Sequence, residues 1–352
     1  MSVKDEMVFE RIPAPLLSWY NSHKRDLPWR KEPTPYHTWV SEIMLQQTRV
    51  EAVKEYYARF IAALPTVYEL ASCEEEKLLK LWEGLGYYNR VRNMQKAARV
   101  IVNEYDGEFP CSPTELENLP GIGTYTAGAI ASIAFGLPVA AVDGNVLRVA
   151  ARLCENATVI SDQAYKKRLT QALSAVYPKD AKGCADFTQS LFELGALVCK
   201  PQNPDCAFCP LQKLCGAYEN GTQSLYPVLP PKKSKREERV YVFLLETPQG
   251  LCIRRREDGV LKGMNEFPSF VAMHGESAEE ILNEWGIYEF TEIKRGTFTH
   301  IFTHIRWDIT CVWARTTSAP FDAYSLTEIR ENISLPTAFK QCLRLLDENY
   351  GL

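Results

Sequence analysis

Four closely spaced cysteines carry the plainest chemical signal in this sequence. The spacing C-x6-C-x2-C-x5-C separates Cys199, Cys206, Cys209 and Cys215. Thiolates placed at such intervals on one loop can hold a single metal centre, because cysteine sulfur is a ligand of both zinc and iron–sulfur clusters. The proline and polar residues between them make a poor core segment, which argues against four unrelated buried thiols. The spacing alone leaves zinc and an iron–sulfur cluster both open.

Two carboxyl groups stand in otherwise apolar stretches. Glu42 is flanked by Trp39 and Ile43, and a carboxyl half-buried there should have a raised pKa and carry a proton near neutral pH. Asp143 precedes an apparent helix start, where an N-cap carboxylate accepts backbone N–H groups and stays ionised. A protonated acid paired with an ionised carboxylate suits cleavage of a glycosidic bond through an oxocarbenium-like transition state. The alternative for Glu42 is a solvated glutamate on a helix, and the alternative for Asp143 is an aspartate that only caps a helix.

A glycine-containing turn, LPGIGTY, joins two expected helices at 114–118 and 127–135. Gly121 and Gly123 would let backbone N–H groups approach an anion, and the following helix would direct its amino terminus at the same place. The pattern is typical of a helix-hairpin-helix phosphate clamp, which grips the DNA backbone without reading sequence. A plain helix–helix turn would also use glycine.

Basic and aromatic residues gather at two further places. The loop 84–89, GLGYYN, precedes a run with Arg90, Arg92, Lys96 and Arg99, and a second cluster holds Lys24, Arg25, Trp29 and Arg30. Such mixtures suit a nucleic-acid strand that must be held while a wedge enters the base stack. A surface turn before a basic helix is the alternative for the first cluster.

The composition limits the class of protein. The chain has 352 residues, of which 46% are hydrophobic, and its net charge is -4, so it can bury a core and carries no bulk positive field. The longest nearly apolar run, 127–142, is too short for a membrane span, and the first ten residues, MSVKDEMVFE, do not contain the apolar stretch of a signal peptide. We therefore expect an intracellular protein, cytoplasmic or nucleoid-associated if bacterial, without a disulfide framework. The other seven cysteines are expected to be core residues.

The pattern along the chain predicts two domains. Amphipathic helical stretches run to about residue 220, among them 38–59, 74–82, 90–104 and 163–176. A Pro-rich, then charged segment at 226–239 is predicted to be a linker. Short β-like runs at 240–246, 251–254, 297–300 and 307–313, with one helical stretch at 277–285, predict a small α+β domain.

The first 220 or so residues resemble the endonuclease III superfamily of DNA glycosylases, because the hairpin turn, the following aspartate and the cysteine loop occur together and in order. Within it, the match to MutY-type adenine DNA glycosylases is carried by SEIMLQQTRV, WEGLGYYNR and AVDGNVLR. The resemblance implies an all-α helix-hairpin-helix catalytic domain with an iron–sulfur loop over 1–225, a linker over 226–239, and a Nudix-like 8-oxoguanine recognition domain over 240–352. It also implies a 4Fe–4S cluster on the four cysteines and a monomer that acts on double-stranded DNA with 8-oxoguanine:adenine or guanine:adenine mispairs.

The resemblance further implies roles for individual residues. Glu42 would protonate a flipped adenine, Asp143 would stabilise the sugar cation, and Tyr125 and Asn145 would support them by hydrogen bonding. Lyase relatives carry a lysine at the position of Tyr125, so a monofunctional enzyme is expected. The resemblance implies contacts of Trp29, Arg30 and Gln189 with adenine, with Arg25 nearby. Near the lesion it implies Gln47, Thr48, Leu85 and Tyr87, of which Gln47 and Tyr87 would be wedged into the duplex, and in the clamp it implies Gly121 and Gly123.

The second domain resembles the lesion-reading domain of that family at Phe302-Thr303-His304, where threonine replaces the usual serine. The alternative is that these are polar residues of a β-hairpin. No Arg-Glu-x-x-Glu-Glu segment occurs between Gly263 and Ile287, which argues against nucleotide hydrolysis. Three other functions remain as alternatives: a glycosylase/lyase for oxidised pyrimidines, a non-catalytic iron–sulfur DNA-binding protein, and a nucleotide hydrolase.

Overall fold

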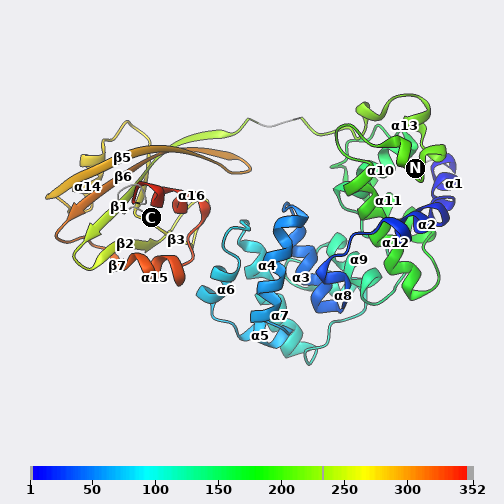
Figure 1. Cartoon of the computed structure of the whole chain (residues 1–352), viewed down its shortest axis with the longest axis horizontal. Coiled ribbons are helices and arrows are strands. Elements are labelled where there is room, and N and C mark those ends of the chain that lie inside the picture. The colour runs from blue at the N-terminus through cyan, green and yellow to red at the C-terminus, as the bar shows by residue number, and fades with distance from the viewer. Residues whose placement is uncertain (1–2, 232–233, 347–352) are drawn as a thin grey trace. The chain divides into compact units, whose positions relative to one another are not determined.

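A computed structural model describes residues 3–231 and 234–346, which form two compact units (Figure 1). One unit comprises Met1–Ser72 and Asn93–Pro231, and the other comprises Cys73–Arg92 and Lys232–Leu352. The first is helical and the second is built on a mixed sheet, as the predicted fold class required. Within the described residues, no helix has the length and apolar character needed to cross a membrane.

Short helices separated by turns build the first unit. Their bounds are α1 Val3–Glu10, α2 Pro13–His23, η1 Pro28–Arg30, α3 Pro35–Leu45, α4 Val50–Ala63, α5 Val67–Ser72, α8 Pro113–Asn118, α9 Thr124–Ile133, α10 Gly144–Cys154, α11 Gln163–Ala175, α12 Ala181–Glu193, η2 Leu194–Val198, η3 Cys206–Phe208, η4 Gln212–Leu214, α13 Gly216–Glu219 and η5 Gln223–Leu225. The helix α7 Asn89–Glu104 belongs to this unit from Asn93 onward. The helical stretch expected over 38–59 is interrupted, because Gln47 takes a left-handed φ of 59° between α3 and α4.

A shared core holds α10, α11 and α12 against the amino-terminal helices. Leu147 of α10, Leu169 of α11 and Phe187 of α12 belong to one buried cluster that also includes Phe9 and Leu16. The buried side chains recur at helical spacing, so each helix buries one face, and the shared core fixes how α10 and α12 lie relative to each other. The polar residues at the start of α10 and the end of α12 are positioned by these contacts.

The second unit has a sheet with the strand order β3-β2-β1-β6-β5, in which β4 also pairs with β1 and β7 with β2. The strands are β1 Arg236–Thr247, β2 Gly250–Arg255, β3 Asn265–Glu266, β4 Ser269–Ala272, β5 Phe290–Ile301, β6 Ile305–Thr316 and β7 Asp322–Tyr324. The central pair, β1 and β6, is parallel, and β5 and β6 form an antiparallel hairpin. Strand β1 begins inside the segment predicted as a linker.

Helices cover both faces of this sheet (Figure 1). Because successive strand residues point to opposite faces, Val242 and Leu244 join a core with α15 Leu326–Glu331, α16 Thr337–Lys340 and η6 Gln341–Leu343. Phe243 and Leu245 pack on the other face with α14 Ala278–Glu284. The sheet is thus the middle layer of three.

The segment Cys73–Arg92, with α6 Glu75–Leu81, groups with the second unit although it lies inside the range 1–225. Glu76 accepts hydrogen bonds from Asn265 Nδ2 at 2.6 Å and the Ser334 amide at 3.0 Å. Lys80 Nζ donates to the carbonyl of Ile333 at 3.0 Å. A polar set of contacts therefore joins α6 to the carboxy-terminal part of the chain.

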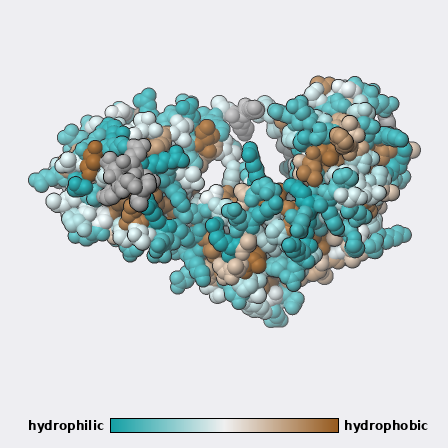
Figure 2. Space-filling model, in the orientation of Figure 1, coloured by the Kyte–Doolittle hydropathy of each residue, from teal (hydrophilic) through white to brown (hydrophobic). Residues whose placement is uncertain are grey.

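The scattered cysteines differ in their burial. Five of them are buried, whereas Cys111 is exposed and Cys154 is half-buried, so the expectation that all are core residues is wrong for Cys111. On the face drawn in Figure 2, hydrophilic residues prevail and hydrophobic ones form small separate groups.

Candidate active site

One cavity of about 1060 Å³ in the helical unit brings together most of the residues singled out from the sequence. Those that line it are Arg25, Trp29, Arg30, Glu42, Gln47, Thr48, Tyr125, Asp143, Asn145 and Gln189. They come from separate segments between Arg25 and Gln189, so only the tertiary fold unites them. Gly121 and Gly123 lie in the turn before α9, whereas Leu85, Tyr87, Phe302, Thr303 and His304 belong to the second unit.

Glu42 is buried on α3, with 5% of its surface exposed. The hydroxyl of Tyr125, on the first turn of α9, donates a hydrogen bond to Glu42 Oε2. Burial raises the pKa of Glu42 to about 7; the Tyr125 hydrogen bond and Arg30 oppose this rise, and Asp143 adds to it. A carboxyl with this pKa carries a proton in a large part of the molecules at neutral pH and can serve as a general acid.

Asp143 is the N-cap of α10, as its place before a helical pattern predicted. Its Oδ1 accepts the Val146 amide at 2.8 Å, and its Oδ2 accepts Asn145 Nδ2 at 2.7 Å. Burial raises the pKa of Asp143, while these hydrogen bonds and Arg148 favour the ionised form. The carboxylate is thereby fixed in orientation at the cavity, where a positive charge on a bound molecule would be stabilised.

Arg148 ties this carboxylate to the segment that begins the cysteine loop. Its Nη2 donates to Asn145 Oδ1 at 2.8 Å and to the Gly195 carbonyl at 2.9 Å, and its Nε donates to the Cys199 carbonyl at 2.8 Å. A Cβ on Gly195 would lie 2.5 Å from that of Asn145, so only glycine permits this approach of η2 to α10. Arg148 therefore orients Asn145, which in turn orients Asp143.

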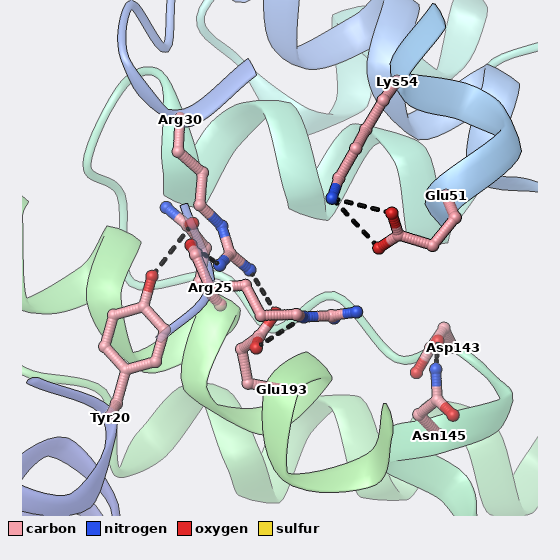
Figure 3. A network of polar contacts seen from close by, with 9 residues as sticks. Tyr20, Arg25, Arg30, Glu51, Lys54, Asp143, Asn145 and Glu193 are labelled. Carbon is pink, nitrogen blue, oxygen red and sulfur yellow. Dashed lines mark hydrogen bonds and ion pairs between the residues drawn. The ribbon is translucent and has the colours of Figure 1, made fainter. Parts of the chain in front are cut away.

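The wall of the cavity also carries an ion cluster centred on Glu193, the last residue of α12 (Figure 3). Glu193 is fully buried and accepts hydrogen bonds from both Arg25 and Arg30, each at 2.7 Å to Oε1. Nearby, Tyr20 donates to Gln189 Oε1 at 3.0 Å. Sequence reasoning missed Glu193, although a lone carboxylate in the apolar run SLFELGALV is a signal that a cation must face it.

The four clustered cysteines line one small pocket. Burial, together with their mutual proximity, raises the pKa of Cys206, Cys209 and Cys215. Arg152 donates from Nη1 to Cys199 Sγ at 3.4 Å. Among the described residues no three or more His, Cys, Asp or Glu side chains are arranged as a site for a metal ion. The all-sulfur donor set, with an N–H aimed at one sulfur, fits the thiolate ligands of an iron–sulfur cluster.

The turn between α8 and α9 combines two glycines with the start of a helix. Gly121 takes φ +78°, and the Ile122 amide closes the turn on the Leu119 carbonyl at 3.1 Å. Gly123 is the N-cap of α9, and a Cβ there would meet nothing within 4 Å. The start of α9 is thus open to an anion, while Tyr125 in the first turn of the same helix faces Glu42.

In the second unit, Tyr87 and the Phe302-Thr303-His304 segment meet. The segment forms the tip of the β5–β6 hairpin, as one of the two interpretations required, and Phe302 packs edge-on against Trp307. The hydroxyls of Tyr87 and Thr303 lie 3.2 Å apart. Tyr87 is half exposed in a left-handed conformation, φ 48°, which residues other than glycine rarely adopt.

Two family models match the chain. That of the HhH-GPD superfamily base excision DNA repair protein matches residues 40–175, and that of the NUDIX domain matches residues 240–345. A thermostable thymine-DNA glycosylase of known structure is similar to 62% of this chain over 98% of its own, with a TM-score of 0.55 and 30% identity. An endonuclease III–DNA covalent intermediate gives a TM-score of 0.52 at 25% identity, over 63% and 99%. The class is therefore a helix-hairpin-helix base excision repair protein with a Nudix-type domain.

Curated relatives narrow this class. An adenine DNA glycosylase of Mus musculus is 34% identical over 95% of this chain and 77% of its own length, and one of Buchnera aphidicola is 34% identical over 85% and 84%. The chain belongs to the MutY-type adenine DNA glycosylase family. It spans 56% of the length of the Arabidopsis thaliana relative, which is 36% identical over 84% of this chain.

Proposed function

We propose that this chain is a monofunctional adenine DNA glycosylase that removes adenine paired with 8-oxoguanine or guanine in duplex DNA, in base excision repair. The observation that carries the proposal is the pairing, in one cavity, of Glu42, whose pKa is raised to about 7, with the capped carboxylate of Asp143. One group donates a proton to the leaving base, and the other faces the positive charge that develops on the sugar.

The chemistry follows from the two carboxyl environments. Glu42 protonates the flipped adenine, which makes the base a better leaving group, and then helps position the attacking water. Asp143, held by Asn145 and the Val146 amide, stabilises the oxocarbenium-like sugar. Tyr125 replaces the amine that a lyase needs for a Schiff base, so the product is free adenine and an intact strand with an abasic site.

The adenine is received by the wall that carries Trp29, Arg25, Arg30 and Gln189. Trp29 is 7% exposed and offers an apolar surface, while the Gln189 amide oxygen is engaged by Tyr20. The donors on this wall suit a base with nitrogen acceptors, since the guanidinium groups present N–H donors only.

Gln47 and Tyr87 act as wedges in the duplex in this proposal. Both have the left-handed backbone that is typical of strained functional positions. A base can leave the stack more easily when a side chain takes its place, so a wedge lowers the cost of flipping the adenine.

The four cysteines hold a 4Fe–4S cluster in this proposal, through Cys199, Cys206, Cys209 and Cys215. When bound, the cluster supplies structural order and DNA engagement and takes no part in hydrolysis. Arg152 donates to one sulfur and to the carbonyls of Lys200 and Pro201, so the protein already fixes the first ligand segment. In the second unit, Phe302, Thr303 and His304 recognise 8-oxoguanine in this proposal. The enzyme acts as a monomer.

A gel assay tests the proposal. The full chain is incubated with a duplex that contains one 8-oxoguanine:adenine pair, and the products are separated with and without alkali. We expect cleavage of the adenine strand only after alkali, and Glu42→Gln should abolish excision while retaining binding to the mispair. Cleavage without alkali would identify a lyase, and absence of any excision by protein with its cluster intact would refute the glycosylase.

A further inference from the structure

We propose that Glu193 is a positioning residue of the glycosylase: it holds the guanidinium groups of Arg25 and Arg30 at the wall of the cavity and balances their charge beside Glu42. The inference rests on the proposed function and deepens it. It assigns a role to a buried charged side chain that the acid–base pair does not itself use.

The geometry of the contact is that of a clamp. Arg25 engages the carboxylate in a fork, with Nε 2.9 Å from Oε2 and Nη2 2.7 Å from Oε1. Arg30 meets the same carboxylate end-on, with Nη2 2.7 Å from Oε1, and its Nη1 donates to the Arg25 carbonyl at 3.0 Å. Both guanidinium planes are thus fixed by Glu193, which limits their rotamers (Figure 3).

Glu193 is buried, and Arg25 and Arg30 are the cations paired with it. The Glu193 side chain is 0% exposed, and those of Arg25 and Arg30 are 29% and 15% exposed. Burial alone would raise the pKa of Glu193, but the two arginines hold it below its usual value. A carboxylate so enclosed keeps its charge only because it is paired, and removing it would leave two partly buried cations without a counter-ion.

The charge of this cluster reaches Glu42. The groups that act on the Glu42 carboxyl are Tyr125 of α9, Asp143 at the start of α10, and Arg30 of η1. Arg30 favours the ionised form of Glu42, and the same Arg30 is paired with Glu193. Two further cations that line the same cavity are Arg148 and Lys166. Without Glu193, the unbalanced arginines would stabilise the Glu42 carboxylate and remove its proton near neutral pH.

The test compares Glu193→Gln with the wild-type chain. Single-turnover excision of adenine is measured from about pH 5.5 to 9, with enzyme in excess and the DNA fully bound. We expect the midpoint of the alkaline fall in rate to lie about one pH unit lower in Glu193→Gln than in the wild type. At pH values above the midpoints of both proteins the variant should therefore be about tenfold slower, and at low pH the two rates should agree. Glu51→Gln is the matched control, because Glu51 pairs with Lys54 in the same unit but does not line the cavity.

The pH profiles of the single variant and of a double variant can each overturn the proposal. A rate that falls equally at every pH, with the midpoint unchanged, would overturn the proposal and leave Glu193 a purely structural residue. The double change Arg30→Gln with Glu193→Gln removes one cation together with the anion, and its midpoint should return toward that of the wild type. A double variant that stays at the midpoint of the single one would also count against the charge balance.

A measurement that does not depend on excision distinguishes failure of this proposal from failure of the proposed glycosylase function. The ionisation of Glu42 is followed by infrared difference spectroscopy of its carboxyl band, identified by its loss in Glu42→Gln. The midpoint should lie lower in Glu193→Gln than in the wild type even if no DNA is cleaved. If Glu193→Gln does not fold, Arg30→Gln alone gives the test with the opposite sign: its midpoint should rise, and an unchanged midpoint would refute the coupling.

Discussion

The hydroxyl of Tyr125 donates a hydrogen bond to the buried carboxyl of Glu42, and so links the hairpin helix α9 to α3. Gly123, which begins α9 and is open to an anion, and Tyr125, which bonds the proposed acid, therefore lie within one turn of the same helix. This contact also favours the ionised form of Glu42 and keeps the rise of its pKa, caused by burial, at about 7. Removing the hydroxyl should thus change the acidity of Glu42 in a known direction.

Tyr125→Phe is expected to move the alkaline limb of excision to higher pH. The phenol stabilises the carboxylate, so its loss raises the pKa of Glu42 above about 7 and keeps the acid protonated further into the alkaline range. The measurement is the single-turnover rate against pH, with Tyr68→Phe as a control because Tyr68 is exposed and bonds the Asp106 carbonyl. A midpoint that stays in place or moves down would contradict the assignment.

Glu42→Gln should stabilise the helical unit at alkaline pH. The folded pKa of about 7 lies above the ordinary 4.5, so ionisation of Glu42 costs stability as pH rises through this window. A rise in pKa from 4.5 to about 7 corresponds to a loss of about 3 kcal/mol of unfolding free energy in the wild type as the pH rises. Glutamine does not ionise, so the variant does not suffer this loss. Denaturant unfolding at pH 5 and pH 8 measures the change, and the advantage of the variant should grow with pH.

The control for this prediction is Glu51→Gln, since Glu51 is exposed and its pair with Lys54 contributes little. Its difference from wild type should be small at both pH values. An advantage of Glu42→Gln that is the same at pH 5 and pH 8 would mean that the buried carboxyl is not the source.

Much of this site can be predicted from the sequence, because the patterns that indicate it involve residues close together in the chain. The helix start at Asp143, the glycine turn at Gly121 and the cysteine spacing each depend on residues a few positions apart, and the structure has the corresponding cap, turn and shared pocket. The ion cluster was not predictable in the same way. Arg25 and Glu193 are 168 positions apart, and only the packing of α12 beside the amino-terminal helices brings them together.

The same physical reason explains the segment Cys73–Arg92. Its helical pattern predicts α6, but nothing local indicates that Glu76 will pair with the Ser334 amide, 258 positions away. Local capping and periodicity therefore predict elements, and long-range polar pairs decide which unit an element joins.

Arg148→Lys should slow excision about ten- to hundredfold while leaving much of the DNA affinity. A single ammonium group cannot reach Asn145, Gly195 and Cys199 together, so Asn145 loses the partner that directs its amide at Asp143. Single-turnover rates and binding to an uncleavable duplex measure the two effects. The matched control is Arg99→Lys, which changes an arginine of α7 whose Nε bonds the Ala71 carbonyl away from the cavity. Equal rates in the two variants would remove Arg148 from the orienting chain.

The hydroxyls of Tyr87 and Thr303 lie 3.2 Å apart at the tip of the β5–β6 hairpin, so Thr303→Val removes a hydrogen bond and keeps the side-chain shape. We expect the preference for 8-oxoguanine over guanine opposite adenine to fall about three- to tenfold, the range of one hydrogen bond. Single-turnover rates on the two mispairs measure this preference. Thr303→Ser retains the hydroxyl and should retain the preference, and Thr297→Val serves as a control on β5. If Thr303→Val and Thr303→Ser discriminate alike, the hydroxyl has no part in reading the lesion.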